Sequence, residues 1–423
     1  MSNDLISGKV LMVKYNECEA DRFYHKYDYD EDNRLTAVYT SRDAQIWDKD
    51  ASYNYYAHGP LRRVQIGEDS IQGLDYAYTI HGWLKGINAP TQSQDIGQDN
   101  TSPGFAPDVW GMGLGYYDGD YKYPGSVFHS DASNPWQAQA NNRSLFNGNI
   151  STWSSYTSGD TTAIAYRYHY DFLNRIRASQ ALDLNTSASG NFWEEASNQR
   201  FHTHYSYDGN GNLLNLQRRD ETGTLMDSLT YEYYPGNNRL KGLAETASDR
   251  ANYPNEIKQK VNDVGSDPLY EYDEIGNLTL DHGEDLAVDW NVYGKVNEVA
   301  SSNPTSVPKP TILYRYDAAG NRVMKQVTQP HGDSKTTYYV RDAQGNVLSI
   351  YEQFHTNPAR QTEIPIYGSD RLGMFLPRFN LANNNTTGGF AHRLVGHKRY
   401  ELKDHLGKRP GGGRRSKTSK RGW

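Results

Sequence analysis

The segment YSYDGNGNL, residues 205–213, returns along the chain as YEYDEIGNL at 270–278 and as YRYDAAGNRV at 314–323. Two further copies, YDYDEDNRL at 27–35 and YHYDFLNRI at 168–176, carry Asn in place of the glycine. The shared phrase is Tyr-x-Tyr-Asp, two variable residues, Gly or Asn, and then Asn or Arg before an apolar residue. Self-similarity of this kind indicates a repeat protein.

Weaker relatives of the phrase fill much of the remaining chain. They are YNYYAHGPL from Tyr53, YAYTIHGWL from Tyr76, YEYYPGNNRL from Tyr231, VDWNVYGKV from Val288, YVRDAQGNV from Tyr339 and YELKDHLGK from Tyr400. Steps between successive starts range from 18 to 92 residues, and three of them are 26. This loose spacing favours hairpins joined by outer loops of variable length.

Each copy has a direct physical reading as a hairpin. Tyr314 and Tyr316 are two residues apart, so both rings leave the same face of a strand. Asp317 suits the first position of a type I turn, because its carboxylate can accept backbone N–H groups further along. Gly320 stands where a three-residue hairpin loop needs a positive φ, and Val323 opens the returning strand.

The same reasoning predicts structural turn positions in six copies. They are Asp30 and Asn33, Asp171 and Asn174, Asp208 and Gly211, Asp273 and Gly276, Asp317 and Gly320, and Asp342 and Gly345. A single hairpin cannot bury its aromatic face, so successive hairpins must stack. We therefore expect an all-β fold of tandem β-hairpin repeats that form a curled or spiralling sheet.

Composition supports this fold class. The chain has 423 residues, of which 34 are Tyr, 38 Gly and 8 Trp, and aromatic residues make up 13%. Tyrosine suits pleated sheets, where its ring packs across strands and its hydroxyl finds a partner, and it suits helical bundles poorly. This aromatic content also argues against disorder.

Several classes of protein are disfavoured by simple features. Cys18 is the one cysteine, which rules out an internal disulfide framework, and no Cys/His spacing resembles a zinc site. No apolar run is long enough to span a membrane. The start, MSNDLISGKVLMVKYNE, lacks the basic and then apolar order of a signal peptide.

Charge divides the chain into an acidic body and a basic tail. The formal net charge is −7, and without the tail the body keeps 37 basic and 51 acidic residues, a charge of −14. An acidic body argues against a nucleic-acid binder. The tail residues are Lys408, Arg409, Arg414, Arg415, Lys417, Lys420 and Arg421.

These motifs resemble the rearrangement-hotspot (RHS) or YD-repeat family, and specifically its repeat-associated core segment. The resemblance rests on the copies above together with DYAYTIHGWLKGIN from Asp75, VYGKV from Val292, YGSDRLGMF from Tyr367 and RYELKDHLG from Arg399. It implies a hollow β shell around a C-terminal toxin or effector domain, or a cell-adhesion scaffold, outside the producing cell or on its surface. The implied partners are further repeats and that effector domain.

Five segments follow from the motifs and the resemblance. Residues 1–87 and 166–351 are expected to be two blocks of repeats, separated by a Gly-, Asn- and aromatic-rich insertion at 88–165 with short strands of its own. Residues 352–407 correspond to the repeat-associated core, and 408–423 form the tail. The chain is therefore expected to be an internal piece of a larger shell.

The chain departs from the family pattern near its end. Family members that enclose a toxin carry a self-cleavage segment resembling PxxxxDPxGL after the core, and no such segment occurs here. After Gly407 the family continues with a phrase like NVR, whereas this chain reads KRPGGG. One base inserted after the Gly407 codon turns NVRVVV into KRPGGG, so we expect the tail to be a frameshift product, which the coding DNA can test.

No enzyme constellation emerges, and no cofactor is expected. His202 and His204 lie two apart without a third metal ligand in the pattern, the aspartates stand at turn positions, and the GMGLG run at 111–115 lacks the rest of a nucleotide-binding motif. The leading hypothesis is a non-catalytic shell scaffold.

Two alternatives remain open beside the scaffold. One is a module that binds carbohydrate or a cell surface through exposed Trp110, Tyr116, Tyr117 and Trp153 of the insertion, which a glycan array would detect. The other is toxin activity in the basic tail, which deletion of residues 408–423 would test.

Overall fold

The chain is described from a computed structural model, which places residues 2–4, 7–88, 96–97, 99, 106–117, 119–121, 144–158, 163–187, 190–247, 268–303, 308–377, 379–380 and 396–407. Every regular element in these ranges is a β-strand, and the strands pair antiparallel. The predicted all-β class is confirmed. Within these ranges no helix could cross a membrane. The basic tail at 408–423 lies outside them.

The first sheet contains 17 strands, each of which pairs with the next along the chain, except that β14 pairs with β12 and β13 is attached to β12 alone. Its strands are β1 Ser2–Asn3, β2 Val10–Tyr15, β3 Phe23–Tyr29, β4 Leu35–Ser41, β5 Asp48–Tyr55, β6 Leu61–Ile66, β7 Gln72–Tyr78, β8 Leu84–Ile87, β9 Trp110–Gly115, β10 Thr152–Thr157, β11 Ile164–Tyr170, β12 Ile176–Ser187, β13 Gly190–Glu195, β14 Thr203–Tyr207, β15 Leu213–Arg219, β16 Leu225–Tyr233 and β17 Leu240–Glu245.

The second sheet contains 12 strands in the same sequential order, with β28 attached to β26 and β29 to β27. They are β18 Tyr270–Tyr272, β19 Leu278–Asp281, β20 Leu286–Trp290, β21 Val296–Ser301, β22 Thr311–Tyr316, β23 Arg322–Thr328, β24 Ser334–Arg341, β25 Val347–Phe354, β26 Arg360–Tyr367, β27 Arg371–Phe375, β28 Phe379–Asn380 and β29 Lys398–Tyr400. Leu269 N–H donates to the Lys241 carbonyl at 2.9 Å, so the second sheet continues directly from the first.

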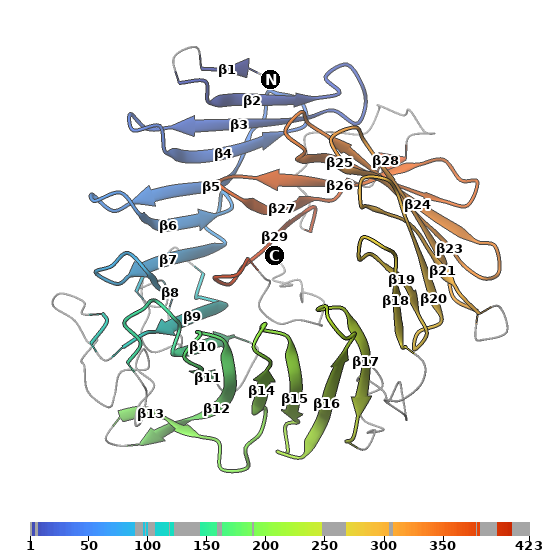
Figure 1. Cartoon of the computed structure of the whole chain (residues 1–423). Coiled ribbons are helices and arrows are strands. Elements are labelled where there is room, and N and C mark those ends of the chain that lie inside the picture. The colour runs from blue at the N-terminus through green and yellow to red at the C-terminus, as the bar shows by residue number, and fades with distance from the viewer. Residues whose placement is uncertain are drawn as a thin grey trace.

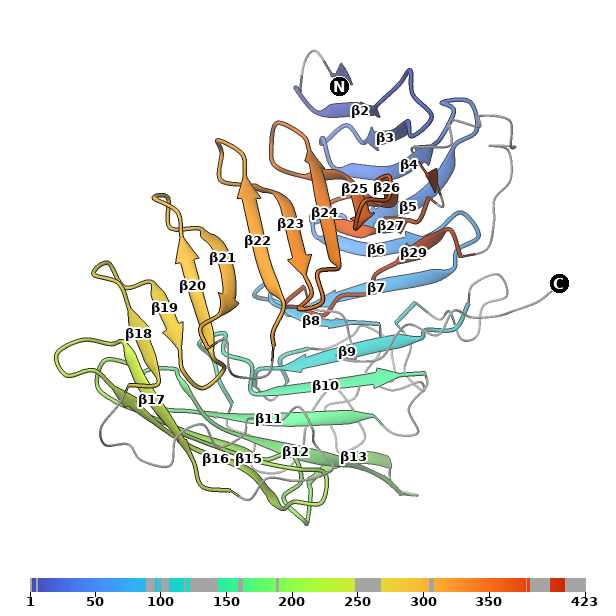
Figure 2. The same cartoon turned by 90° about the vertical axis from the view of Figure 1, so that its right-hand side faces the viewer.

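The two sheets form one strip that curls around (Figure 1). Strands β2 to β9 descend one side, β10 to β17 cross the bottom, and β18 to β25 rise on the other side. Strands β26, β27 and β29 then return into the middle and lie beside β4 and β5, which a view turned by 90° also shows (Figure 2). The curl follows from the twist that every β-strand carries, which accumulates along a meander.

The concave face carries the main core. Tyr53 pairs with Val64 across strands β5 and β6, and both side chains are buried together with Val38, Trp110 and Met112. Leu372, Tyr400 and Leu402 from the end of the chain pack against the same cluster. Tyr27, Tyr55 and Tyr76 pack against this cluster too, because alternate residues of a strand face the same side.

Strands β9 and β10 come from the segment interpreted as an insertion. They pair with β8, with each other and with β11, and so they extend the sheet of the repeats. The GMGLG run forms most of β9 and is buried throughout. Its glycines allow close packing: a Cβ atom added at Gly115 would collide with the Thr152 hydroxyl.

Candidate functional site: turns, latches and the closing seam

The predicted turn residues lie in hairpin loops of one geometry. The third residue after each Asp has positive φ: Asn33 at 60°, Asn174 at 63°, Gly211 at 93°, Gly276 at 99°, Gly320 at 80° and Gly345 at 92°. In all six loops an Oδ1 atom accepts the N–H of the residue four places on, at 2.7 to 3.0 Å: Asp30, Asp171, Asp208, Asp273, Asp317 and Asp342. The backbone N–H of Asn321 lowers the pKa of Asp317 in this way, against a smaller opposing effect of desolvation.

One further turn of this kind, at Asp220, was not predicted from the repeat motif. Asp220 accepts the N–H groups of Thr222 and Thr224, both at 2.9 Å, and Gly223 has φ of 83°. The spacing Asp-x-x-Gly was visible in the sequence, but the segment lacks the paired tyrosines. This turn joins β15 to β16, at the end of β15 away from the loop that carries Asp208.

The second tyrosine of the repeat acts as a latch between hairpins. Its hydroxyl donates to a backbone carbonyl at or near the start of the returning strand in the preceding hairpin. Such latches are Tyr55 to Leu35 (2.8 Å), Tyr170 to Ile150 (2.8 Å), Tyr207 to Ile176 (2.7 Å), Tyr233 to Leu213 (2.9 Å), Tyr272 to Leu240 (3.0 Å) and Tyr316 to Val296 (2.8 Å). Each repeat therefore holds the next by a hydrogen bond as well as by the strand ladder.

Two copies without that tyrosine keep the latch with another donor. In the β20 copy, Trp290 Nε1 donates to the Leu278 carbonyl at 2.8 Å. In the β24 copy, Arg341 Nε donates to the Arg322 carbonyl at 3.0 Å. The latch thus requires a side chain whose hydrogen-bond donor reaches the backbone carbonyl of the preceding hairpin. This explains why the copies without the second tyrosine still fit the array.

Arginine at the end of the turn adds a second contact between repeats. The Arg34 guanidinium lies 4.8 Å from the ring centroid of Tyr55, and Arg175 lies 4.7 Å from that of Tyr207. Both arginines also pair through Nε with the aspartate of their own turn. The copies with Gly in the turn carry Asn at this position instead, and its Nδ2 donates to Oδ2 of the turn aspartate, as Asn212 does to Asp208 at 2.7 Å.

Strand β29 is joined to strands β4 and β5 by an ionic seam, which consists of Thr40, Asp48, Asp50, Lys398 and Tyr400. Lys398 Nζ lies 2.7 Å from Asp50 Oδ1, 2.7 Å from Thr40 Oγ1 and 3.1 Å from Asp48 Oδ2. Tyr400 and Thr40 both donate hydroxyl hydrogen bonds to Asp50, at 2.8 and 2.5 Å. Asp50 is fully buried, so its charge depends on these partners.

A tyrosine seam lies at the top of the same contact and consists of Tyr15, Asp21, Ser349, Tyr351 and Gln361. The Tyr351 hydroxyl donates to Asp21 and lies 2.6 Å from the Tyr15 hydroxyl. Gln361 Nε2 donates to Ser349 Oγ at 2.9 Å. Burial, and then the hydrogen bonds with Asp21 and Tyr15, raise the pKa of Tyr351.

Aromatic and polar contacts add to the two seams. Phe23 packs on Phe375 with ring centroids 5.5 Å apart, and Arg42 lies 5.5 Å from the Phe375 centroid. The Tyr53 hydroxyl accepts the Ser369 N–H at 3.4 Å. Strands β25 to β29 are therefore fixed against β2 to β5 by charged, polar and apolar contacts together.

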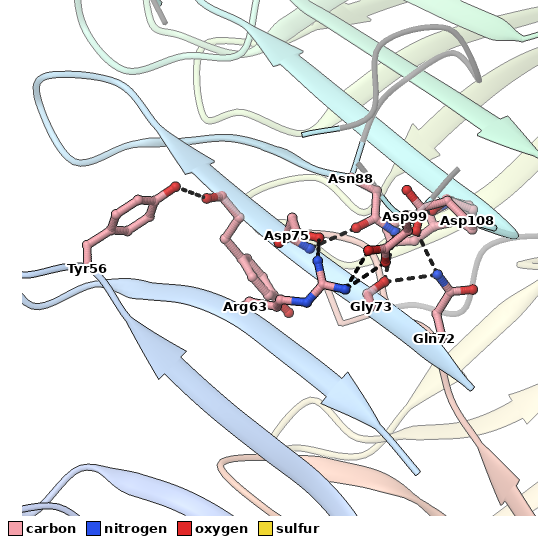
Figure 3. A network of polar contacts seen from close by, with 10 residues as sticks. Tyr56, Arg63, Gln72, Gly73, Asp75, Asn88, Asp99 and Asp108 are labelled. Carbon is pink, nitrogen blue, oxygen red and sulfur yellow. Dashed lines mark hydrogen bonds and ion pairs between the residues drawn. The ribbon is translucent and has the colours of Figure 1, made fainter. Parts of the chain in front are cut away.

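A third polar network lies at β6 and β7 (Figure 3). Arg63 pairs with Asp75 at 2.5 Å and with Asp99 at 2.6 Å, and all three side chains are largely buried. Gln72 Nε2 donates to Asp108 at 2.7 Å, and Asn88 Nδ2 donates to the Trp110 carbonyl at 2.9 Å. The network ties residues 88, 99 and 108 to the repeats and so guides the chain from β8 into β9.

The residues proposed for carbohydrate binding are mostly not available at the surface. Trp110 and Tyr116 are buried in the main core, at 2% and 5% exposure, and Trp153 packs against that core. That interpretation of Trp110 and Tyr116 was wrong, because the strand they flank is enclosed on both faces. Tyr117 is half-buried, and its ring contacts those of His81 and Phe146.

The described residues hold no cluster of metal-ligand type. In that part of the chain no three His, Cys, Asp or Glu side chains come close enough to hold a metal ion. Burial lowers the pKa of His202, and His204 is exposed on β14. The aspartates of the repeats are engaged with backbone N–H groups in their turns.

Comparison with known proteins identifies similar solved structures only. No family model matches the chain, and no curated protein does. A chain of the Photorhabdus luminescens Tc holotoxin pore, solved with a TccC3 mutation, is similar at a TM-score of 0.54 and 15% identity, covering 92% of this chain and 16% of that chain. The crystal structure of TcdB2-TccC3-TEV matches at a TM-score of 0.32 and 13% identity, over 90% of this chain and 22% of that chain. The crystal structure of TcdB2-TccC3 matches at a TM-score of 0.31 and 14% identity, over 96% of this chain and 23% of that chain. The chain thus shares an RHS-type all-β fold with part of a much longer toxin-complex chain.

Proposed function

We propose that this chain is a non-catalytic wall segment of a larger RHS-type shell, which encloses or delivers a C-terminal toxin or effector domain outside the producing cell. The observation that carries the proposal is the pair of seams between strands β25–β29 and β2–β5. A repeat array that serves only as a linear spacer has no need for contacts between repeats that lie far apart in the sequence. A wall that separates an interior from the solvent needs such contacts, because they hold the curled strip closed.

The latches support the same role. They fix the angle between successive hairpins through the backbone, so the curvature of the strip depends little on the variable residues of each turn. The fold shared with part of a Tc holotoxin pore chain is consistent with a scaffold in such a complex. The partners under this proposal are further repeats and the effector domain of the same protein.

A protease-protection experiment on the product of the complete natural coding sequence tests this function. A domain enclosed by the shell should resist added protease in the intact protein and should be digested when the ionic seam is broken by Lys398→Met. The matched control is Lys403→Met, which removes a lysine whose partner Asp370 is mostly exposed. Equal digestion of the downstream domain in all three proteins would contradict enclosure.

A further inference from the structure

A lysine and an aspartate form the most deeply buried ion pair among the described residues, and we call them the β8 pair. Lys85 lies on β8, and Asp120 lies 35 positions later in the segment that follows β9. Their side chains are 0% and 1% exposed, whereas Lys398 of the ionic seam is 16% exposed. Lys85 Nζ lies 2.7 Å from Asp120 Oδ1 and 2.9 Å from Oδ2. The ammonium group therefore contacts both oxygens of one carboxylate away from water.

These two contacts bring the lysine nitrogen close to the carboxyl carbon itself. Both oxygens are bonded to Cγ, so an atom at 2.7 and 2.9 Å from them lies within about 3.2 Å of that carbon, and reacting atoms about 3–3.5 Å apart are in a near-attack arrangement. Burial also lowers the pKa of Lys85, against the opposing attraction of Asp120, which favours the neutral and nucleophilic amine. The β8 pair thus holds a nucleophile against an acyl carbon.

The two oxygens of Asp120 have different surroundings. Tyr116 N–H donates to Oδ2 at 2.9 Å, and a fixed backbone donor of this kind stabilises the negative charge that develops when an amine adds to a carboxyl group. The Tyr116 hydroxyl donates to the Leu84 carbonyl at 2.8 Å, which fixes this donor beside β8. The contact of Lys85 with Oδ1 lacks hydrogen-bond geometry, and Oδ1 has no other partner in the described part of the chain. Oδ2 is therefore held in place, and Oδ1 is the oxygen that can leave.

The β8 pair differs in this respect from the ion pair of the ionic seam. Asp50 accepts hydrogen bonds from Lys398, Thr40 and Tyr400, so both of its oxygens are engaged. Attraction within a buried ion pair offsets the cost of desolvation only when such additional hydrogen bonds satisfy the remaining lone pairs. The carboxylate of Asp120 lacks them at Oδ1. An amide in place of the β8 pair removes both buried charges, and the exclusion of water protects that amide from hydrolysis.

We propose that Lys85 and Asp120 form an intramolecular isopeptide bond once the chain has folded, a modification that goes beyond the scaffold role. A bond forms between Lys85 Nζ and Asp120 Cγ, and the bond between Cγ and Oδ1 breaks. Two protons of the ammonium group pass to Oδ1, which leaves as water. Oδ2 remains as the amide oxygen and keeps the hydrogen bond from Tyr116 N–H. The reaction needs no oxidant, reductant or other reactant, and it joins β8 covalently to the segment after β9.

Mass spectrometry of the intact, natively purified chain tests the proposal. The folded wild type should be lighter than its sequence by the mass of one water molecule, and a protease digest should yield a branched peptide that contains both Lys85 and Asp120. Lys85→Arg keeps a positive charge beside Asp120 and should show the full sequence mass, because a guanidinium stays protonated and does not attack a carboxyl group. Lys398→Arg is the matched control in the ionic seam and should keep the loss of water.

Three outcomes would overturn the proposal. The first is a wild-type mass that still equals the sequence mass after prolonged incubation of the folded chain. The second is a branched peptide that joins residues other than Lys85 and Asp120. The third is a loss of water that persists in Lys85→Arg. The wild-type mass decides the question even if Lys85→Arg does not fold, because that measurement needs no variant. None of these results bears on protease protection, so the scaffold function stands or fails separately.

Discussion

Replacement of Lys398 by Met isolates the ionic seam. The change keeps most of the side-chain volume and removes the ammonium group 2.7 Å from Asp50 Oδ1. Asp50 is then left as a fully buried carboxylate. Removal of one partner from a buried ion pair costs about 3–5 kcal/mol. Thr40 and Tyr400 still donate to Asp50, so we expect the lower end, about 3 kcal/mol.

That free energy should appear as local opening of the seam. Each 1.4 kcal/mol changes an opening equilibrium about tenfold, so the seam should open about a hundredfold more often. Native-state hydrogen exchange measures this opening directly. Amides of β27 and β29 should exchange about a hundredfold faster in Lys398→Met, whereas amides of β15, which lies far along the strip, should keep their wild-type rates.

Two further variants decide whether the effect comes from the buried charge. Lys403→Met breaks a pair whose partner Asp370 is 70% exposed, so it should cost under about 1 kcal/mol. Combining Asp50→Asn with Lys398→Met removes the buried carboxylate together with its partner, so the amides of β27 and β29 should regain part of their protection from hydrogen exchange. Equal exchange rates of the β27 and β29 amides in Lys398→Met and Lys403→Met would show that the ionic seam does not stabilise this contact.

Three other expectations follow from the turns, the latches and a buried histidine. Tyr316→Phe removes a latch hydroxyl and should lower the free energy of unfolding, measured by denaturant titration, by about 1 kcal/mol. The control Tyr293→Phe changes an exposed ring, and its free energy of unfolding should stay within about 0.5 kcal/mol of the wild-type value. Gly320→Ala forces φ of 80° on an L-residue and should cost about 1–2 kcal/mol, whereas Gly242→Ala, in a strand with open space around it, should cost nothing measurable. Burial, and then a neighbouring lysine, lowers the pKa of His25 from 6.5 to about 4. Between pH 6.5 and 4 the unfolded chain therefore binds a proton at His25 that the folded chain does not bind. The free energy of unfolding should fall by about 3 kcal/mol as the pH drops from 6.5 to 4. In His25→Phe this fall should be absent from unfolding midpoints measured over the same pH range.

The hairpins could be predicted from the amino-acid sequence. A hairpin is local: Tyr314, Tyr316, Asp317 and Gly320 lie within seven residues, and the conformation each requires is a property of its own backbone and its near neighbours. The apolar residue that opens the returning strand could be identified for the same reason. The all-β class followed, because hairpins with one aromatic face must stack to bury it.

The contacts between repeats far apart in the sequence could not be predicted in this way. Lys398 and Asp50 are 348 positions apart, and no local rule relates them, because their contact depends on curvature summed over more than twenty strands. The same curvature encloses Trp110 and leaves Phe146 exposed, although both belong to one aromatic-rich segment. Local backbone preferences thus fixed the unit of this protein, and the accumulated twist of the strip placed its seams and its core.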